Sequence, residues 1–76
     1  MSHLMKLQTD LNNINKRISH IETEIAYCQQ NINDPIYIAL LEKRLKELNV
    51  AKDSLQVTIA DCISLYELYD RLTSKH

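Results

Sequence analysis

Two long segments, each with apolar residues at alternating spacings of three and four, flank a single break in this chain. The break is Asn33-Asp34-Pro35, which holds the only proline of the 76 residues, and the chain has no glycine. Asp34 can cap the free amides of a following helix, and Pro35 suits the first helical position because no N–H is needed there. The residue before a proline disfavours the α region, so a helix arriving from upstream must end here. These signals predict a helix, a tight turn and a second helix.

The first segment carries an unbroken heptad pattern. Its apolar positions are Leu4, Leu7, Leu11, Ile14, Ile18, Ile21, Ile25, Cys28 and Ile32. This is the seam of a coiled coil, whereas strands would need a period of two. Asn12, Asn13 and Asn15 are poor interior helix formers, and we expect packing to carry the helix through them.

The second segment repeats the pattern with one interruption. Its seam is Ile38, Leu41, Leu45, Leu48, Lys52, Leu55, Ile59, Cys62, Tyr66 and Tyr69. A lysine at a core heptad position lowers stability but can fix the register, and its long stem can reach water. We interpret Lys52 as such a register-setting residue, because no acidic partner or reactive context surrounds it.

Antiparallel packing predicts layers of residues whose numbers add up to about 66. The predicted layers are Cys28 with Ile38, Ile25 with Leu41, Ile21 with Leu45, Ile18 with Leu48, Ile14 with Lys52, Leu11 with Leu55, Leu7 with Ile59, and Leu4 with Cys62. All but one are apolar on both sides. The same register places Glu24 across from Arg44, an expected surface ion pair worth about 0.5 kcal/mol.

The predicted fold is all-α: a single-domain antiparallel two-helix hairpin of coiled-coil type over residues 1–76, with helices at about 4–31 and 35–73 and a turn at about 32–35. At 1.5 Å per residue the helices measure ~42 and ~58 Å, so the second overhangs the first. Residues 64–72 then have no partner in the chain. Val50 and Val57 lie seven residues apart on the face opposite the seam. The predicted partner-binding residues are Val50, Val57, Leu65, Tyr66, Leu68, Tyr69 and Leu72.

No motif indicates catalysis, a cofactor or a metal. The three histidines and two cysteines lack the paired spacings of zinc ligands, and no Ser/His/Asp set or glycine-rich loop is present. Cys28 and Cys62 fall at opposite ends of the hairpin, ~36 Å apart by the helix rise, so they cannot form a disulfide within one chain. We therefore expect two free cysteines and no enzymatic activity.

Charge and hydropathy limit the partners. Nine basic and ten acidic residues give a net charge of -1, and the basic run Lys43-Arg44-Lys46 is interleaved with Glu42 and Glu47, so nucleic-acid binding is not expected. No apolar run approaches the ~18 residues of a membrane span, and two cysteines suggest a reducing compartment. Met1-Ser2-His3 has the form of an expression-vector remnant, and we place no function on His3. The expected partner is another protein, because so small a chain rarely buries enough apolar surface to be stable alone.

The chain resembles the small YscE/SsaE/EscE-type co-chaperones of type III secretion. The resemblance lies in a heptad first helix, the turn Asn33-Asp34-Pro35-Ile36-Tyr37 and a longer second helix. In that family a short helical hairpin pairs with a tetratricopeptide-like chaperone subunit, and together they keep the needle subunit soluble in the bacterial cytosol. The resemblance implies a small non-enzymatic co-chaperone in the bacterial cytoplasm, with a chaperone subunit, a needle subunit or both as partners.

Two self-assembling alternatives remain. Type III secretion needle subunits are also helical hairpins of this size, with a Pro-x-(Asp/Asn)-Pro turn. Here only the second proline is present, as Pro35, and Ile32 stands at the first position. A homodimeric four-helix bundle would cover the overhang with a second copy of the chain.

Overall fold

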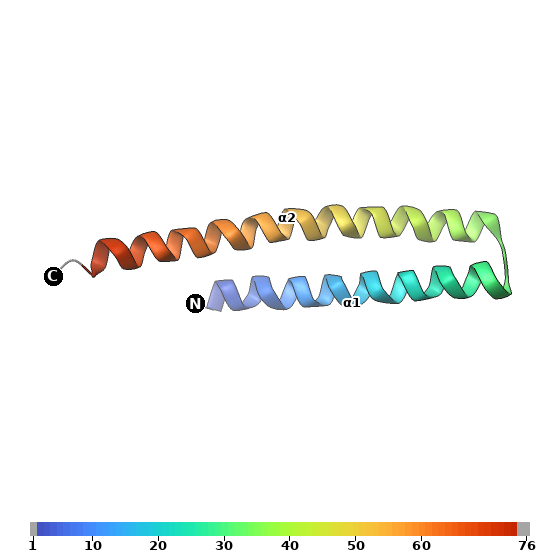
Figure 1. The fold of residues 1–76 in the computed structure, drawn as a ribbon, viewed down its shortest axis with the longest axis horizontal. Coiled ribbons are helices and arrows are strands. Elements are labelled where there is room, and N and C mark those ends of the chain that lie inside the picture. The colour runs from blue at the N-terminus through green and yellow to red at the C-terminus, as the bar shows by residue number, and fades with distance from the viewer. Residues whose placement is uncertain (1, 75–76) are drawn as a thin grey trace.

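In the computed structural model, which describes residues 2–74, the chain forms two antiparallel helices (Figure 1). They are α1 (Ser2–Asn31) and α2 (Pro35–Thr73), and no strand occurs among these residues. The predicted all-α hairpin is confirmed. α1 begins two residues earlier than the sequence pattern indicates, and α2 has the expected bounds.

The turn between the helices is fixed by two neighbouring residues. Asn33 has a φ of 50°, a left-handed conformation that asparagine tolerates better than most residues and that commonly ends helices. The carbonyl of Cys28 accepts hydrogen bonds from the amides of both Ile32 and Asn33, which closes the last turn of α1. Asp34 then opens α2 as its N-cap: its side chain accepts from the amides of Ile36 at 3.1 Å and Tyr37 at 3.3 Å.

Burial follows the predicted seam along both helices. The buried side chains are Cys28, which is fully buried, and Ile18 and Ile38, which are 8% and 9% exposed. Half-buried seam residues are Leu4, Leu7, Leu11, Ile14, Ile21, Ile25, Leu41, Leu45, Leu48, Lys52, Leu55, Ile59, Cys62 and Tyr66. Ile32 and Tyr69 are exceptions. The chain leaves α1 at Asn31, so Ile32 is 57% exposed, and Tyr69 near the end of α2 is 65% exposed. Their predicted places in the seam are wrong.

The asparagine-rich stretch of α1 stays helical because its polar side chains face water. Asn12, Asn13 and Asn15 are all exposed, while Ile14 between them faces α2. The seam residue therefore packs, and the amides need no partner in the protein. As expected, the contact between the helices outweighs the low helix propensity of asparagine.

The hairpin is a rod with one helix longer than the other. Its extents are 66 × 15 × 14 Å, and α2 has 39 residues against 30 in α1. Figure 1 shows the C-terminal end of α2 running past the beginning of α1. One end of the rod is thus a tight turn, and the other is a single helix.

Candidate protein-binding surface

The overhang of α2 carries large apolar side chains in water. Leu65, Tyr69 and Leu72 are 64–66% exposed, and Leu68 is also exposed. Leucine and tyrosine at this exposure form a contiguous apolar stripe near the C-terminal end of α2. Such patches mark contact sites for other proteins.

Tyr66 differs from the other predicted residues of the overhang. It is half-buried and lines a hollow with Cys62, Leu65, Tyr69 and His3, the last of which comes from the first turn of α1. The expectation that the whole of 64–72 lacks a partner in the chain is therefore wrong at this position. α1 begins earlier than expected, which brings its first turn beside Tyr66.

A second exposed strip lies on the outer face of α2. Val50 and Val57 are 64% and 62% exposed, and their spacing of seven places both on the same side of the helix. The structure thus leaves both predicted valines open to solvent, away from the seam.

The turn end of the rod holds further exposed apolar residues, of which the seam pattern includes only Ile32. Tyr27, Ile32, Ile36 and Leu40 are all exposed there. The spacing of four between Ile36 and Leu40, off the seam, is the sequence signal that could have located half of this group. Tyr27 carries no comparable signal.

One polar contact joins the two helices near the turn. The hydroxyl of Tyr37 donates to Oε1 of Glu24 at 3.3 Å. The Glu24 carboxylate and partial burial raise the pKa of the Tyr37 hydroxyl above its usual value. The expected pair of Glu24 with Arg44 does not form, because Arg44 pairs with Glu47 one turn along its own helix at 3.6 Å.

Cys28 lies in the same region and is fully buried. Burial raises the pKa of its thiol, and the carboxylates of Glu24 and Asp34 raise it further. The sulfur lies 4.0 Å from Oε1 of Glu24. A buried thiol held in its neutral form is a poor nucleophile, so Cys28 acts as a small apolar core residue.

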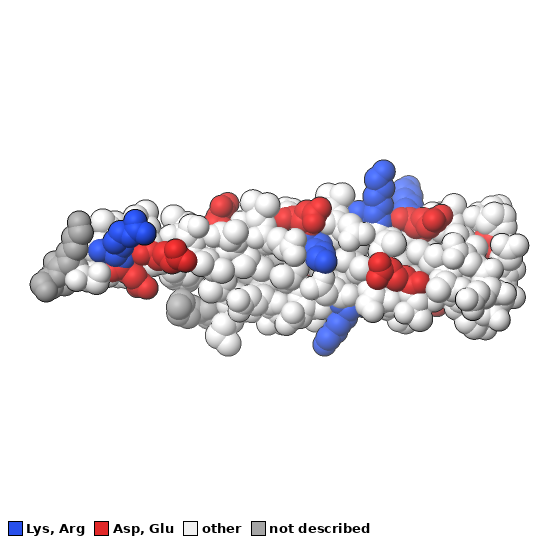
Figure 2. All heavy atoms as spheres, in the orientation of Figure 1, with Lys and Arg blue, Asp and Glu red and all other residues white. Residues whose placement is uncertain are grey.

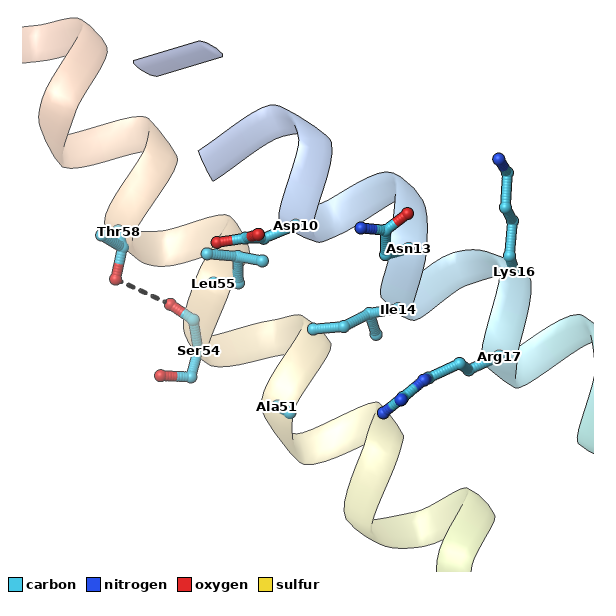
Figure 3. Close-up of a pocket in the computed structure, with 9 residues that line it drawn as sticks. All are labelled: Asp10, Asn13, Ile14, Lys16, Arg17, Ala51, Ser54, Leu55 and Thr58. Carbon is cyan, nitrogen blue, oxygen red and sulfur yellow. Dashed lines mark hydrogen bonds between the residues drawn. The ribbon is translucent and has the colours of Figure 1, made fainter. Parts of the chain in front are cut away.

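A groove lies between the helices at mid-length. Figure 3 shows Ile14 and Leu55 directed into the space between α1 and α2, with Arg17 reaching toward Ala51. Lys16 extends away from α2. The sequence pattern does not reveal this groove, because it depends on the small Ala51 lying beside the seam.

The charges visible on one face of the rod have both signs. Acidic and basic groups are interspersed along α2 in Figure 2, and the turn end is almost free of charge on this face. Within residues 2–74 no group of three potential ligands could hold a metal ion, and no helix is long and apolar enough to cross a membrane. Both cysteines are free thiols.

Comparison of the chain with protein-family models, with curated proteins and with solved structures finds no match.

Proposed function

We propose that this chain is a non-enzymatic interaction module that works in complex with another protein. The partner would bind the exposed residues of the overhang (Leu65, Leu68, Tyr69 and Leu72) together with the Val50/Val57 strip. The observation that carries the proposal is the overhang itself, where four large apolar side chains lie exposed near the end of the longer helix. Tyr66 is half-buried, so only the exposed part of its side chain would contact the partner.

The accessible surface area of the chain is large enough to leave room for a binding partner. The accessible surface is 6127 Å², whereas a compact monomer of 8.9 kDa is expected to expose roughly 4,800 Å². The surplus of about 1,300 Å² exceeds the ~800 Å² that one protein contributes to an interface of standard size. Each leucine or valine fully buried in such an interface would contribute roughly 1.5–3 kcal/mol before ordering costs.

The finer assignment is a co-chaperone of a bacterial type III secretion system. Its support is the turn Asn33-Asp34-Pro35-Ile36-Tyr37 and the longer second helix, which are the features of the resemblance described above. On this proposal the chain acts in the bacterial cytoplasm. It pairs through α2 with a tetratricopeptide-like chaperone subunit, and the pair keeps a needle subunit soluble.

Light scattering coupled to size exclusion tests the proposal. The chain alone is expected to remain a small species as its concentration rises, and to form a defined complex when it is co-expressed with the chaperone and needle subunits of its own organism. Leu68→Asp should weaken that complex about tenfold or more, because it places a charge in the apolar contact. Met5→Asp, at an exposed apolar residue on α1, is the matched control and should leave the complex intact.

Two other results would contradict the proposal and favour a self-assembling protein. Growth into long polymers would favour a needle-type subunit. A stable dimer that ignores both candidate subunits would favour a homodimeric four-helix bundle.

A further inference from the structure

A continuous groove follows one side of the hairpin between α1 and α2. Three adjoining hollows make it up, and they share residues: Lys16 and Arg17 line the first and second, and Ile21 and Arg44 line the second and third. The middle hollow has a volume of ≈ 410 Å³. Because the hollows share their boundaries, they form one path along the rod.

The floor of this groove is apolar. Its apolar lining residues are Ile14, Ile21, Leu40, Leu41, Leu48, Ala51 and Leu55. Ala51 provides the open space at the centre, since its methyl group fills little of the gap that Figure 3 shows between Ile14 and Arg17. A groove with an apolar floor between two helices is the kind of site that receives an amphipathic helix.

The rim of the middle hollow is basic. Lys16, Arg17 and His20 from α1 and Arg44 from α2 line it. No acidic side chain lines this hollow among residues 2–74, whereas Asp10 lines the first hollow and Glu47 lines the third. Glu47 pairs with Arg44 at 3.6 Å, but both side chains stay mostly exposed, so the pair is weak and Arg44 can exchange partners.

The length of the groove sets the length of its occupant. Along α2 it extends from Leu40 to Thr58, which is ~27 Å at the helical rise. A helix of about 18 residues spans that distance. Acidic residues beside its apolar stripe would meet Arg17 and Arg44, whose guanidinium groups bind carboxylates well.

We propose that this groove binds an acidic amphipathic helix of a partner protein, forming a three-helix bundle with α1 and α2. The proposal rests on the proposed function only in taking the partner to be a protein, and it concerns a different surface from the overhang. The basic rim of the middle hollow selects the acidic helix, and the apolar floor supplies the contact area.

The test uses an 18-residue peptide, acetylated and amidated, with leucine at heptad positions a and d and glutamate at e and g. A twin peptide has lysine in place of each glutamate. The glutamate peptide is expected to bind one-to-one, to bind more weakly as salt is raised, and to bind at least tenfold more tightly than the lysine twin. Amide shifts in a ¹⁵N spectrum should change most around Arg17, Ile21 and Leu48.

Arg17→Glu should weaken binding of the glutamate peptide about five- to tenfold, and Arg17→Gln should weaken it less. Lys46→Glu is the matched control, because Lys46 does not line the groove, and should change the affinity less than twofold. Circular dichroism checks that each variant is folded.

Equal binding of the two peptides, or no effect of Arg17→Glu in a folded variant, would overturn the proposal. So would shifts confined to residues 65–72, or a homodimer that fills the groove and excludes the peptide. Leu68→Asp tests the overhang separately, so failure of one surface does not imply failure of the other.

Discussion

At the scale of single residues, Lys52 is the one charged side chain at a core heptad position of either helix. It is half-buried in the layer predicted to contain Ile14. Lys52→Leu should raise the free energy of unfolding by about 1 kcal/mol, which corresponds to about 4–8 °C in Tm for a domain of this size. Thermal circular dichroism measures the change.

Lys46→Leu is the control for that substitution. Lys46 is exposed on the same helix, so its replacement should move Tm by no more than about 2 °C. A neutral or destabilising Lys52→Leu would mean that Lys52 does not pack in the seam.

The raised pKa values of Tyr37 and Cys28 predict how the free energy of unfolding changes at high pH. The pKa of each group is raised in the folded chain, so folding favours its protonated form. Their contribution is fully present below the ordinary pKa values of 9.0 and 10.0, and is lost as pH rises through the higher folded-state values. Stability should therefore fall above about pH 9.

Tyr37→Phe isolates the tyrosine's share of this dependence. It removes the ionising hydroxyl that donates to Glu24 and leaves the ring in place. The variant should be slightly less stable than the wild type at pH 7, and the difference should shrink toward pH 11. Urea unfolding at a series of pH values makes the measurement, and Tyr69→Phe, in the exposed overhang, is the control. A difference that does not change with pH would contradict the Tyr37–Glu24 contact.

At the scale of the elements, α2 depends on its N-cap. Asp34 accepts two amide hydrogen bonds, so Asp34→Ala should cost about 1 kcal/mol and lower Tm by about 4–8 °C. Asp53→Ala removes an exposed aspartate from the interior of the same helix and should change Tm little. Equal effects of the two substitutions would show that the cap contributes nothing.

The helices and their seam could be predicted from the sequence because each depends on local or periodic information. Asp34 and Pro35 mark the start of α2 by their own chemistry, and the spacing of three and four sets which side is buried. Ile32 was misplaced because periodicity alone does not show where a helix ends. Here α1 ends at Asn31, and the left-handed conformation of Asn33 turns the chain away from the helix axis, so Ile32 does not reach the seam.

The surface could be predicted only in part. The exposure of the overhang leucines follows from the difference in helix length, and that of Val50 and Val57 follows from their place opposite the seam. The partners of Glu24 could not be predicted, because several side chains reach it and their surface interactions differ by fractions of a kcal/mol. The groove beside Ala51 arises from the shape of two helices together, which no single segment encodes.

At the scale of the whole molecule, the hairpin has little interior for its length. Only Ile18, Cys28 and Ile38 are buried among residues 3–74, although apolar residues make up 45% of the chain. An interior this thin fits a chain whose stability and function both depend on a partner. The central claim of this account is that the end of α2 serves the partner and contributes little to the hairpin itself.

Truncation after Glu67 tests that claim most directly. It removes Leu68, Tyr69 and Leu72 but keeps Tyr66, which the first turn of α1 helps to cover. The shortened chain is measured by thermal circular dichroism, and by light scattering with the co-expressed partner subunits or with a second copy. We predict that Tm falls by no more than about 4 °C, the lower bound for a loss of 1 kcal/mol, while the native association is abolished. A truncated chain that melts at room temperature, or that still forms the full complex, would contradict the account.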